Sequence, residues 1–553
     1  MRRTLTLLLT TVLAAAALAG CAGTNTPTPA TGTPTGGTTP ATTTPSTGAA
    51  SLTLGTTDTI TSLDPGNAYE YLSINVLQNT MGTLLANKPD AAELQPELAT
   101  ALPTISADGL SYSFTLKSGL KYNDGTPIKA GDFLWALERN ADKVGGVEGG
   151  PAFLIYDSPG VDIANSTAPD DTHLTIKLKQ PGVFFNSLLV FPNFAPLPKD
   201  KYTTSAFREP TGTAENLPVS SGPYQLSEYR QGEYLKLTKN PNYSGFRTPK
   251  TDTVTIKIFS TSAALKSALQ NGEVDAAYRT FTPDEWTDLA GKAGVKTAEQ
   301  PGPSPARYLA FNVNKTGSGM EDQRVRQAIA YIVDRADIND AVFSGSVTPL
   351  YSIVVPGLVG AKESYKTMYG ASPNLDKAKT LLEAAGYSAS HKLAIDLWFN
   401  SDGHYGDTEA DLATVLKDQL DSSGYFTVTL QSKPWAEYKK DFRQGNFAMF
   451  LIGWFPDYLD TDDYISPFLT KGGAASFGTF YDNATLQPLI KAEQAESDQS
   501  KRIPILQQIQ DATAADNPML PLFSGKQQAA YRDGVGGVTL SPTNVFPYYT
   551  LTK

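Results

Sequence analysis

The feature that most constrains this fold is an alternation of helix and strand patterns in the C-terminal half of the chain. Apolar residues recur at helix spacing over 325–333 and again between Asn374 and Gly386, which are typical start and stop residues of a helix. Strand patterns follow at 393–397 and 426–430, with further helix patterns between and after them. This order predicts an α/β lobe around a mixed sheet.

Strand patterns also occur in the first half of the chain. Apolar and polar residues alternate over 110–116, and the turn signal Asp124-Gly125 follows shortly after. Segments 174–178 and 254–258 have the same character. With 553 residues, of which 40% are hydrophobic and 10% aromatic, the chain can bury a large core but is too long for a single one. We therefore expect several lobes.

The first twenty residues have the pattern of an export signal. Arg2 and Arg3 supply the positive start, 5–18 is apolar, and small residues precede Cys21. This apolar run is shorter than the about 20 residues that span a bilayer. We interpret 1–20 as a signal peptide of an exported protein. The adjacent arginines leave the twin-arginine route open beside the general secretory route.

Cys21 is the only cysteine of the chain, so no internal disulfide can form. The segment Leu18-Ala19-Gly20-Cys21 resembles a bacterial lipobox, in which the cysteine becomes the lipidated first residue of the mature protein. The alternative is an ordinary signal with an incidental cysteine. The lipobox interpretation predicts a lipid on Cys21 that anchors the protein to the cell membrane, facing the periplasm or the extracellular space.

A segment of low complexity follows the cysteine. From 22 to 50 nearly every residue is Thr, Pro, Gly or Ala, a composition that buries no apolar surface and keeps the backbone extended or mobile. We interpret 21–50 as a lipidated Thr/Pro/Gly-rich tether. The folded part should begin near Ser51.

Charge and motif content argue against several classes of function. The formal charge of −11 describes an acidic chain without a basic stripe, so we expect no nucleic acid partner. The three histidines, His173, His391 and His404, lack the i, i+4 spacing of a helical zinc site, and no glycine-rich phosphate loop is present. We predict no metal and no cofactor.

A serine acyl-enzyme of the penicillin-binding type is the strongest enzymatic alternative. Segment 118–121 matches S-x-x-K and segment 315–317 matches K-T-G. The third element would be 401–403, which lacks the asparagine and falls after the K-T-G. Ser118 also follows a strand, whereas this nucleophile needs a helix start. Solvated loop residues are the favoured interpretation, and we predict no enzyme.

Several segments together resemble the peptide and nickel family of extracytoplasmic solute-binding proteins, the oligopeptide- and dipeptide-binding group of ABC importers. Asn123 stands where that family commonly has histidine, which we interpret as turn variation. Asp334 and Arg335 also match, and we expect them to end the helix over 325–333. The other matches run in the family's order along the chain: 94–99 (LQPELA), 108–109 (DG), 112–117 (YSFTLK), 122–127 (YNDGTP), 222–224 (GPY), 240–243 (NPNY), 269–275 (LQNGEVD), 311–313 (FNV) and 324–329 (RVRQAI).

The resemblance implies a two-lobed, periplasmic-binding-protein-like α/β fold. In that fold a double hinge joins the lobes, the ligand is enclosed between them, and lobe one is discontinuous and carries an inserted subdomain. Segment 517–522 resembles the return crossing into lobe one. Applied to this chain, the resemblance predicts lobe one at 51–90, 218–305 and 525–553, its inserted subdomain at 91–217, and lobe two at 306–524.

The candidate ligand site centres on 453–458 (GWFPDY), which resembles the family's G-W-x-x-D-Y motif. In peptide-binding members that aspartate takes the ligand's α-ammonium group, a role that falls here to Asp457. Alternatively, Asp457 only caps a turn or helix in the acidic run that follows. Trp454 would line the cleft beside the aspartate, and Tyr458 completes the motif.

The resemblance adds three further site residues. Trp435 lies 22 residues before Asp457, and a tryptophan at this distance contributes a side-chain pocket in the family. Aromatic walls suit varied side chains because they offer large apolar area at little entropic cost. Core packing is the alternative for Trp435 and Trp454. Tyr69 and Glu70, in the loop after the first strand of lobe one, would face the same region.

The chain departs from the family where the ligand's carboxylate is bound. Some peptide binders carry a basic residue just before the motif, where this chain has Met449, Phe450 and Leu451. Arg279 and Arg307 could take over this role, but surface salt bridges are the favoured interpretation for both.

These features predict the substrate-binding component of an ABC importer, which captures a short peptide between its lobes and delivers it to a membrane permease. We expect it to act as a monomer. Two alternatives stay open: another solute bound by the same family, such as an oligosaccharide, a nickel chelate or an opine, and a lipoprotein sensor that uses the fold for signalling.

Overall fold

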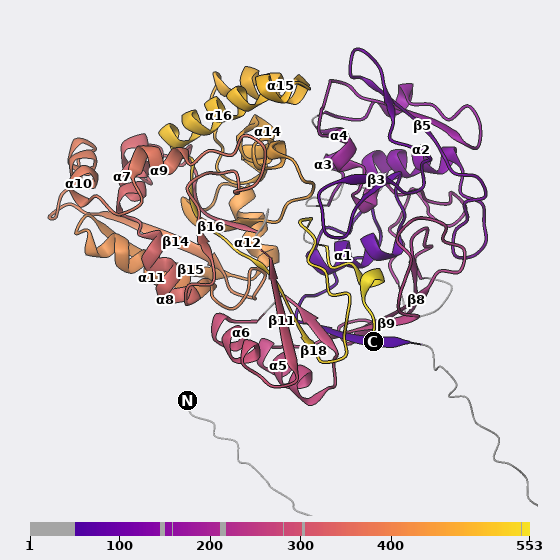
Figure 1. Cartoon of the computed structure of the whole chain (residues 1–553). Coiled ribbons are helices and arrows are strands. Elements are labelled where there is room, and N and C mark those ends of the chain that lie inside the picture. Colours follow the sequence, from indigo (N-terminus) through magenta and orange to yellow (C-terminus); the bar gives the residue numbers. More distant parts are fainter. Residues whose placement is uncertain are drawn as a thin grey trace, which may run out of the picture. The chain divides into compact units, whose positions relative to one another are not determined.

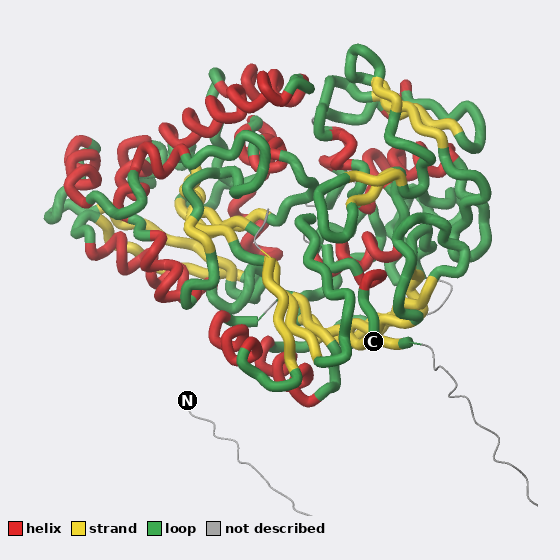
Figure 2. Tube along the Cα trace, in the orientation of Figure 1, coloured by secondary structure: helices red, strands yellow, loops and turns green. Residues whose placement is uncertain are grey.

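The computed structural model describes residues 50–143, 150–157, 159–210, 217–279, 281–300, 305–543 and 545–553. The predicted signal peptide, the lipidation site Cys21 and the tether up to residue 49 lie outside the described residues. No helix among the described residues is long and apolar enough to span a membrane. Two large sheets organise the described chain, and helices gather mainly around the second (Figure 1, Figure 2).

Seven strands of the described residues form the first sheet, to which both ends of the folded chain contribute. Their spatial order is β11 (Val295–Gln300), β18 (Gln527–Arg532), β10 (Ala276–Tyr278), β1 (Ser51–Thr56), β9 (Thr253–Ile258), β8 (Tyr234–Lys239) and β7 (Tyr224–Arg230). The central strand β1 pairs in parallel with β9 and β10. In β9, Val254 and Ile256 are buried and alternate with partly exposed residues, which confirms the strand predicted at 254–258.

Helices α5 (Ser262–Asn271) and α6 (Pro283–Ala290) pack against this sheet (Figure 1). Local sequence signals set their ends. Thr261 and Thr282 each accept a hydrogen bond from a backbone N–H of the first turn, and Gly272 follows α5 in the left-handed conformation, with φ of 81°. The two helices bury Leu265 and Trp286 in a small hydrophobic cluster of their own.

The chain between β1 and β7 adds smaller elements, and we call these together with the first sheet the first lobe. The alternation predicted at 110–116 is confirmed, since Tyr112 and Phe114 are buried while Ser113 is exposed. The strand predicted at 174–178 is also present. The elements are α1 (Tyr71–Thr80), β2 (Leu85–Asn87), β3 (Leu94–Pro96), β4 (Thr104–Ile105), β5 (Ser111–Thr115), α2 (Ala130–Glu138), α3 (Phe153–Tyr156), β6 (His173–Lys177) and α4 (Phe185–Leu188).

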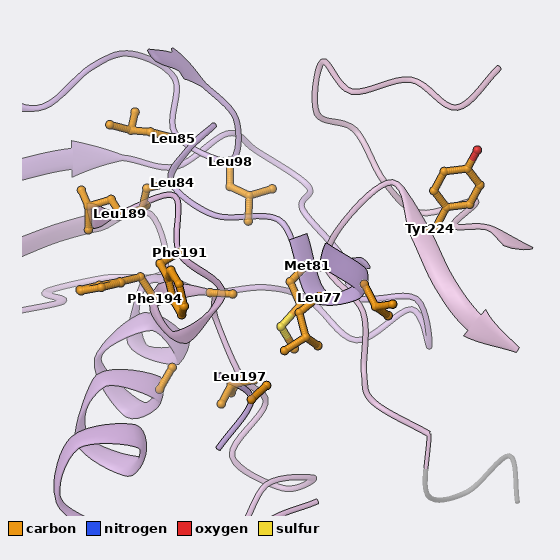
Figure 3. Packing of buried hydrophobic residues seen from close by; sticks show 14 of the residues in the cluster. Leu77, Met81, Leu84, Leu85, Leu98, Leu189, Phe191, Phe194, Leu197 and Tyr224 are labelled. Carbon is orange, nitrogen blue, oxygen red and sulfur yellow. The ribbon is translucent and has the colours of Figure 1, made fainter. Parts of the chain in front are cut away.

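One hydrophobic cluster joins these elements to the first sheet (Figure 3). Leu77 and Met81, from α1 and the residue after it, belong to this cluster together with Leu98, Phe191 and Tyr224. Burial of such large apolar side chains stabilises the folded state by about 1.5–3 kcal/mol each, and this packing holds α1 in place. The loop between β1 and α1 therefore ends at a helix whose position is fixed by packing.

A second sheet and its helices form what we call the second lobe. The described strands lie in the order β13 (Thr348–Pro349), β17 (Met519–Ser524), β12 (Ala306–Phe311), β16 (Met449–Trp454), β14 (Leu393–Asn400) and β15 (Phe426–Lys433). The sheet is mixed, as predicted, because β14 is parallel to β15 and β16 whereas β12 is antiparallel to both of its neighbours. All residues of β12 and β17 are buried.

Helices cover this second sheet and have a separate hydrophobic cluster (Figure 1). In that cluster, α11 packs against β14 and β15, and α7 packs against α10. The helices are α7 (Gln323–Ile332), α8 (Arg335–Phe343), α9 (Ser364–Tyr369), α10 (Leu375–Ala384), α11 (Glu409–Ser422), α12 (Trp435–Arg443), α13 (Ser466–Leu469), α14 (Lys471–Ser476), α15 (Leu486–Ala495) and α16 (Gln499–Asp516).

Helix boundaries agree with the sequence at one place and differ at another. The Asn374 side chain accepts the Lys377 N–H at 3.0 Å and begins α10, and Gly386, with φ of 95°, follows its end as predicted. The prediction that Asp334 and Arg335 end the preceding helix is wrong. Asp334 begins α8 instead, because its carboxylate accepts backbone N–H groups of that helix's first turn.

The return crossing also differs from its predicted position. Residues 519–522 of the segment predicted as the crossing lie in β17, a fully buried strand beside β12. The crossing follows at 525–526, before β18 enters the first sheet. The apolar side chains of this segment explain the difference, since they fill the core of the second lobe.

Candidate functional site

A cavity of about 1020 Å³ lies between the two lobes. Its walls come from the loop between β1 and α1, from the residue after β10, from the chain after β14 and β16, and from α12. All six residues that the sequence assigns to the site line this cavity: Tyr69, Glu70, Trp435, Trp454, Asp457 and Tyr458.

Strand β16 carries the central segment of the site to the cavity wall. Residues 449–452 are buried in the second sheet between β12 and β14. The ladder stops beyond Trp454, and Pro456, which has no N–H to donate, cannot extend it. Asp457 therefore follows the end of β16 by three residues, and its backbone N–H is bonded to Asp463.

Asp457 and Asp463 form a pair of acidic side chains at this point. The Asp457 N–H and the Trp454 Nε1–H both donate to Asp463 Oδ2, each at 3.1 Å. Tyr69 donates its hydroxyl hydrogen to Asp457 Oδ2 at 2.7 Å. Asp463 is fully buried, and its Oδ1 accepts no hydrogen bond from the described residues. The pair is thus held by neutral donors.

Neither carboxyl group of the pair has a cationic partner among the described side chains. Burial raises the pKa of Asp457 to about 7. Burial and the negative charge of Asp457 also hold the pKa of Asp463 well above its usual range. Two acids so close to each other cannot both ionise cheaply without a counter-charge. The arrangement favours a proton or an added cation at this place.

Contacts across the cavity bring the two lobes together in a closed arrangement. The Tyr69 hydroxyl reaches from the first lobe to Asp457 of the second. Tyr458 of the second lobe stacks on Phe184 of the first, with ring centroids 5.2 Å apart. The backbone N–H of Val183 donates to the carbonyl of Gln494 at 2.9 Å.

Trp435 and Glu70 meet at another wall of the cavity. Trp435 stacks on His404, with ring centroids 3.8 Å apart and planes within 7°. Burial, together with the charges of Arg279 and Arg307, lowers the pKa of His404 to about 3, so the imidazole is neutral at pH 7. Burial raises the pKa of Glu70, whose Oε2 lies 3.7 Å from His404 Nδ1. Because the imidazole is neutral, it offers no positive charge for an ion pair with Glu70.

The two interpretations of the tryptophans are both realised. Trp454 makes edge contacts with Phe468 and Phe477, at 5.3 and 5.7 Å between ring centroids. Trp435 and Trp454 are both partly buried against the core of the second lobe, and both also line the cavity. Each indole thus presents one side to the core and another to the cavity.

The expectation of surface salt bridges for the two arginines is wrong. Arg307 is 5% exposed and pairs with Glu409, whose side chain is 6% exposed. Arg279 lines the cavity, where its guanidinium lies 3.9 Å from the Tyr71 ring centroid. Their places in the fold explain the difference, because Arg307 lies in the interior strand β12 and Arg279 directly follows the interior strand β10.

Close packing explains the glycine of the central segment. A Cβ on Gly453 would stand 2.7 Å from Arg307 Nη1 and 2.7 Å from a ring carbon of Tyr405. A side chain at this position would displace one of these groups, which lie against each other with 3.8 Å between the guanidinium carbon and the ring centroid.

The helix cap considered for Asp457 is formed by Asp460 instead. Asp460 accepts the Asp462 N–H at 2.9 Å and begins a 3₁₀ turn (Thr461–Tyr464). The Asp457 side chain instead accepts the hydroxyl hydrogen of Tyr69 from the other lobe.

The serine acyl-enzyme residues lie apart from the cavity. Ser118 and Lys121 are exposed on either side of a turn at Gly119, after a strand as expected. Lys315 follows β12 in the second lobe. None of these residues lines the described cavity. Among the described residues, no group of three His, Cys, Asp or Glu side chains is placed to hold a metal ion.

Sequence reasoning missed two residues of the site. Asp463 lies six positions after Asp457 and could have been suspected only as one member of an acidic run. His404 was considered only as a zinc ligand, yet it forms the stacking platform for Trp435. Both depend on contacts that close in three dimensions, which the local sequence does not reveal.

Comparison with known proteins now decides the family. The model of "Bacterial extracellular solute-binding proteins, family 5 Middle" matches residues 93–476, more than half of the chain. The chain belongs to this family. The match confirms the resemblance inferred from the ordered segments.

Relatives and solved structures agree with the family assignment. The dipeptide-binding protein DppE of Bacillus subtilis (strain 168) is 27% identical over 500 residues, which cover 87% of this chain and 88% of the relative. The glutathione-binding protein GsiB of Escherichia coli (strain K12) is 26% identical over 510 residues, which cover 90% and 94%.

A structure of the oligopeptide-binding protein OppAIV from Borrelia burgdorferi is similar with a TM-score of 0.78 at 22% identity, over 91% of this chain and 99% of that one. This similarity confirms the predicted fold class: a two-lobed α/β fold of the periplasmic-binding-protein type.

Proposed function

We propose that this protein is the substrate-binding component of an ABC importer and that its cargo is a short peptide with a free α-ammonium group. The observation that carries this proposal is the pair Asp457 and Asp463, which faces the cavity without a cationic partner among the described residues. An ammonium group that enters the cavity would supply the missing charge.

The Asp457 carboxylate would bind the ammonium group directly. Tyr69 already donates to one oxygen of this carboxylate, so the second oxygen is the one available to the ligand. Binding would replace the proton that Asp457 holds at low pH by the ligand's charge. Asp463 would act behind Asp457 as a positioning residue, since it accepts hydrogen bonds from the Asp457 N–H and the Trp454 Nε1–H.

Aromatic walls would accept the ligand's side chains. Trp435 and Trp454 line the cavity, and Tyr458 closes it toward the first lobe. Such walls accept varied apolar groups, so specificity for the side chains would be broad. The names of DppE and GsiB, which refer to a dipeptide and to glutathione, also favour a short peptide.

Capture would proceed by closure of the second lobe on the first, as a monomer, followed by delivery to a membrane permease. No bond is made or broken, so we propose no enzymatic activity. The contacts of Tyr69 with Asp457 and of Tyr458 with Phe184 would form on closure and hold the ligand.

The N-terminal part of the chain would keep the protein at the cell membrane. We infer that 1–20 is removed as a signal peptide, that Cys21 carries a lipid, and that 21–50 is the tether. For the folded part we infer lobe one at 51–90, 218–305 and 525–553, the inserted subdomain at 91–217, and lobe two at 306–524.

The decisive test is native mass spectrometry of the purified protein, followed by thermal shift with a peptide pool, for wild type and Asp457→Asn. Co-purified peptides, or a melting temperature raised by the pool, with loss of this response in Asp457→Asn, would support the proposal. Binding of a sugar or a metal chelate but no peptide would overturn the peptide cargo. Asp157→Asn is a matched control, because this carboxyl lines the same cavity and burial raises its pKa as well.

A further inference from the structure

Arg279 lines the cavity, and the hydrogen bonds of its guanidinium are incomplete. Its Nη1 is buried and has no hydrogen-bond partner among the described residues. Its Nη2 lies 3.6 Å from Asp58 Oδ1, beyond hydrogen-bond distance. A buried guanidinium with an unused donor usually has a partner that is supplied from elsewhere.

The backbone holds Arg279 firmly in this position. The residue follows β10, and its N–H donates to the Gln528 carbonyl at 3.0 Å. Its φ of 63° lies in the left-handed region, which is uncommon for a residue with a side chain. Strain of this kind persists where the surroundings determine the conformation, and here it aims the side chain into the cavity.

Both lobes contribute to the surroundings of the guanidinium. Its central carbon lies 3.9 Å from the ring centroid of Tyr71 in the first lobe and 4.8 Å from that of Phe455 in the second. Phe455 lies two residues before Asp457. Aromatic rings satisfy the faces of a guanidinium but leave its N–H groups for partners in its plane.

The other cavity cations lie on α12 in the second lobe. Burial raises the pKa of Tyr69 and the positive charge of Arg443 opposes this rise, but no ion pair joins Arg443 to either acid of the pair among the contacts of the described residues. Lys439 acts on Glu70 at the wall with Trp435. Arg279 is thus the cavity-lining cation of the first lobe among the described residues.

We propose that Arg279 binds a carboxylate of the ligand through Nη1. Arg279 would thus provide the positive charge that segment 449–451, which has no basic residue, cannot provide. This rests on the proposed function and narrows it: the preferred ligand is a zwitterionic peptide, with its ammonium group at Asp457 and a free carboxylate at Arg279. Asp58 acts as a weak internal competitor for the same guanidinium.

The test measures binding of Ala-Phe-Ala and Ala-Phe-Ala-Ala by calorimetry, each as the free acid and as the C-terminal amide. For the wild type we expect the amide to bind about 10- to 100-fold more weakly, the loss typical of a hydrogen bond between charged groups. In Arg279→Gln this difference between acid and amide should vanish. In Lys439→Gln, which removes another cavity cation, the difference should remain.

A second variant keeps the test valid if Arg279→Gln does not fold. Asp58→Asn removes the competing carboxylate and should strengthen binding of the free acids by a few fold while leaving the amides unchanged. Equal affinity of acid and amide for the wild type would overturn the proposal for Arg279, and so would an acid preference that survives in Arg279→Gln. Failure of the wild type to bind either form of either peptide, or any of the peptide pool, would overturn the proposed function itself.

Discussion

Asp457 and Asp460 lie three residues apart in one acidic run, but their charges are handled differently. Asp460 accepts two hydrogen bonds from Arg502, at 2.9 and 2.5 Å, and Arg502 also pairs with the buried Glu493 at 2.8 Å. Asp457 meets only a tyrosine hydroxyl. A buried carboxyl group therefore does not by itself indicate a binding site; what distinguishes Asp457 is that it lines a cavity without a counter-charge among the described residues.

The first lobe shows the same structural use of charge. Arg139 and Asp64, both with side chains fully buried, form two hydrogen bonds of 2.8 and 2.6 Å. Arg247 pairs with Glu97 in the same way. In these two pairs each carboxylate has its cation within the protein, whereas Asp457 and Asp463 have no cationic partner among the described residues.

The largest expected effect is a loss of stability when Arg502 is removed from its ion pairs with Asp460 and Glu493. Arg502→Met leaves Asp460 and Glu493 without their cation, and loss of one partner from a buried ion pair costs about 3–5 kcal/mol of unfolding free energy. Denaturant unfolding measures this. Arg230→Met is the matched control, because the pair of Arg230 with Glu228 is exposed and spans 3.8 Å, so its loss should change stability by less than about 1 kcal/mol. Similar losses of unfolding free energy in both variants would contradict the conclusion that the ion pairs of Arg502 stabilise the fold more than an exposed pair does.

For Asp457 and Asp463 the expected effect is on ligand affinity, which should depend on the positive charge of the ligand. Acetylation of the α-amino group of Ala-Phe-Ala removes the cation, so its affinity for the wild type should fall about 100-fold, within the range for truncating a buried charge pair. In Asp457→Asn the acetylated and free peptides should bind alike. Calorimetry measures both. A preference for the free peptide that persists in Asp457→Asn would assign the ammonium group to another residue.

The pH dependence follows from the raised pKa of Asp457. In the free protein this carboxyl keeps its proton up to about pH 7, and an ammonium ligand must displace that proton. Affinity for Ala-Phe-Ala should therefore fall as the pH drops below 7, by about tenfold per pH unit. Asp457→Asn should remove this slope. An affinity that is constant between pH 5 and pH 7 would contradict the raised pKa.

The same shift predicts the stability of the free protein. Because an unfolded aspartate ionises near pH 3.9, the folded state holds more protons than the unfolded state between about pH 4 and pH 7. Stability that Asp457 contributes is complete at low pH and is lost as the pH rises through this window. Melting temperatures of wild type and Asp457→Asn should converge at low pH and differ above pH 7, with the variant more stable. Parallel curves would be the contrary result.

The smallest effect is expected from the contact between the lobes. Tyr69→Phe removes the hydroxyl that reaches Asp457 but keeps the ring against Phe153. Loss of one such hydrogen bond costs about 1 kcal/mol, so peptide affinity should fall about fivefold. Fluorescence of the tryptophans that line the cavity reports the binding. Tyr156→Phe, at another place on the cavity wall, should leave affinity unchanged. A loss of 100-fold in Tyr69→Phe would mean that the hydroxyl binds the ligand directly.

Much of the fold could be predicted from local patterns. Alternating residues predicted β5 and β9, and Asn374 with Gly386 predicted the ends of α10. The role of Asp334 was predicted wrongly, because an aspartate between two helices can end one or begin the next. Its hydrogen bonds to backbone N–H groups of α8 show that it begins the second helix. The return crossing was predicted too early, at 517–522, because an apolar segment near a hinge does not indicate where its strand ends; β17 continues to Ser524.

By itself the sequence determined the helix and strand periodicity, the family and the contiguous segment 453–458, because these depend on neighbouring residues and their order. Only the tertiary structure decided that Asp463 lies behind Asp457, that His404 supports Trp435, and that Arg279 points into the cavity. The reason is physical. The pKa of a carboxyl group and the partners of a guanidinium depend on burial and on charges that folding brings close from distant parts of the chain.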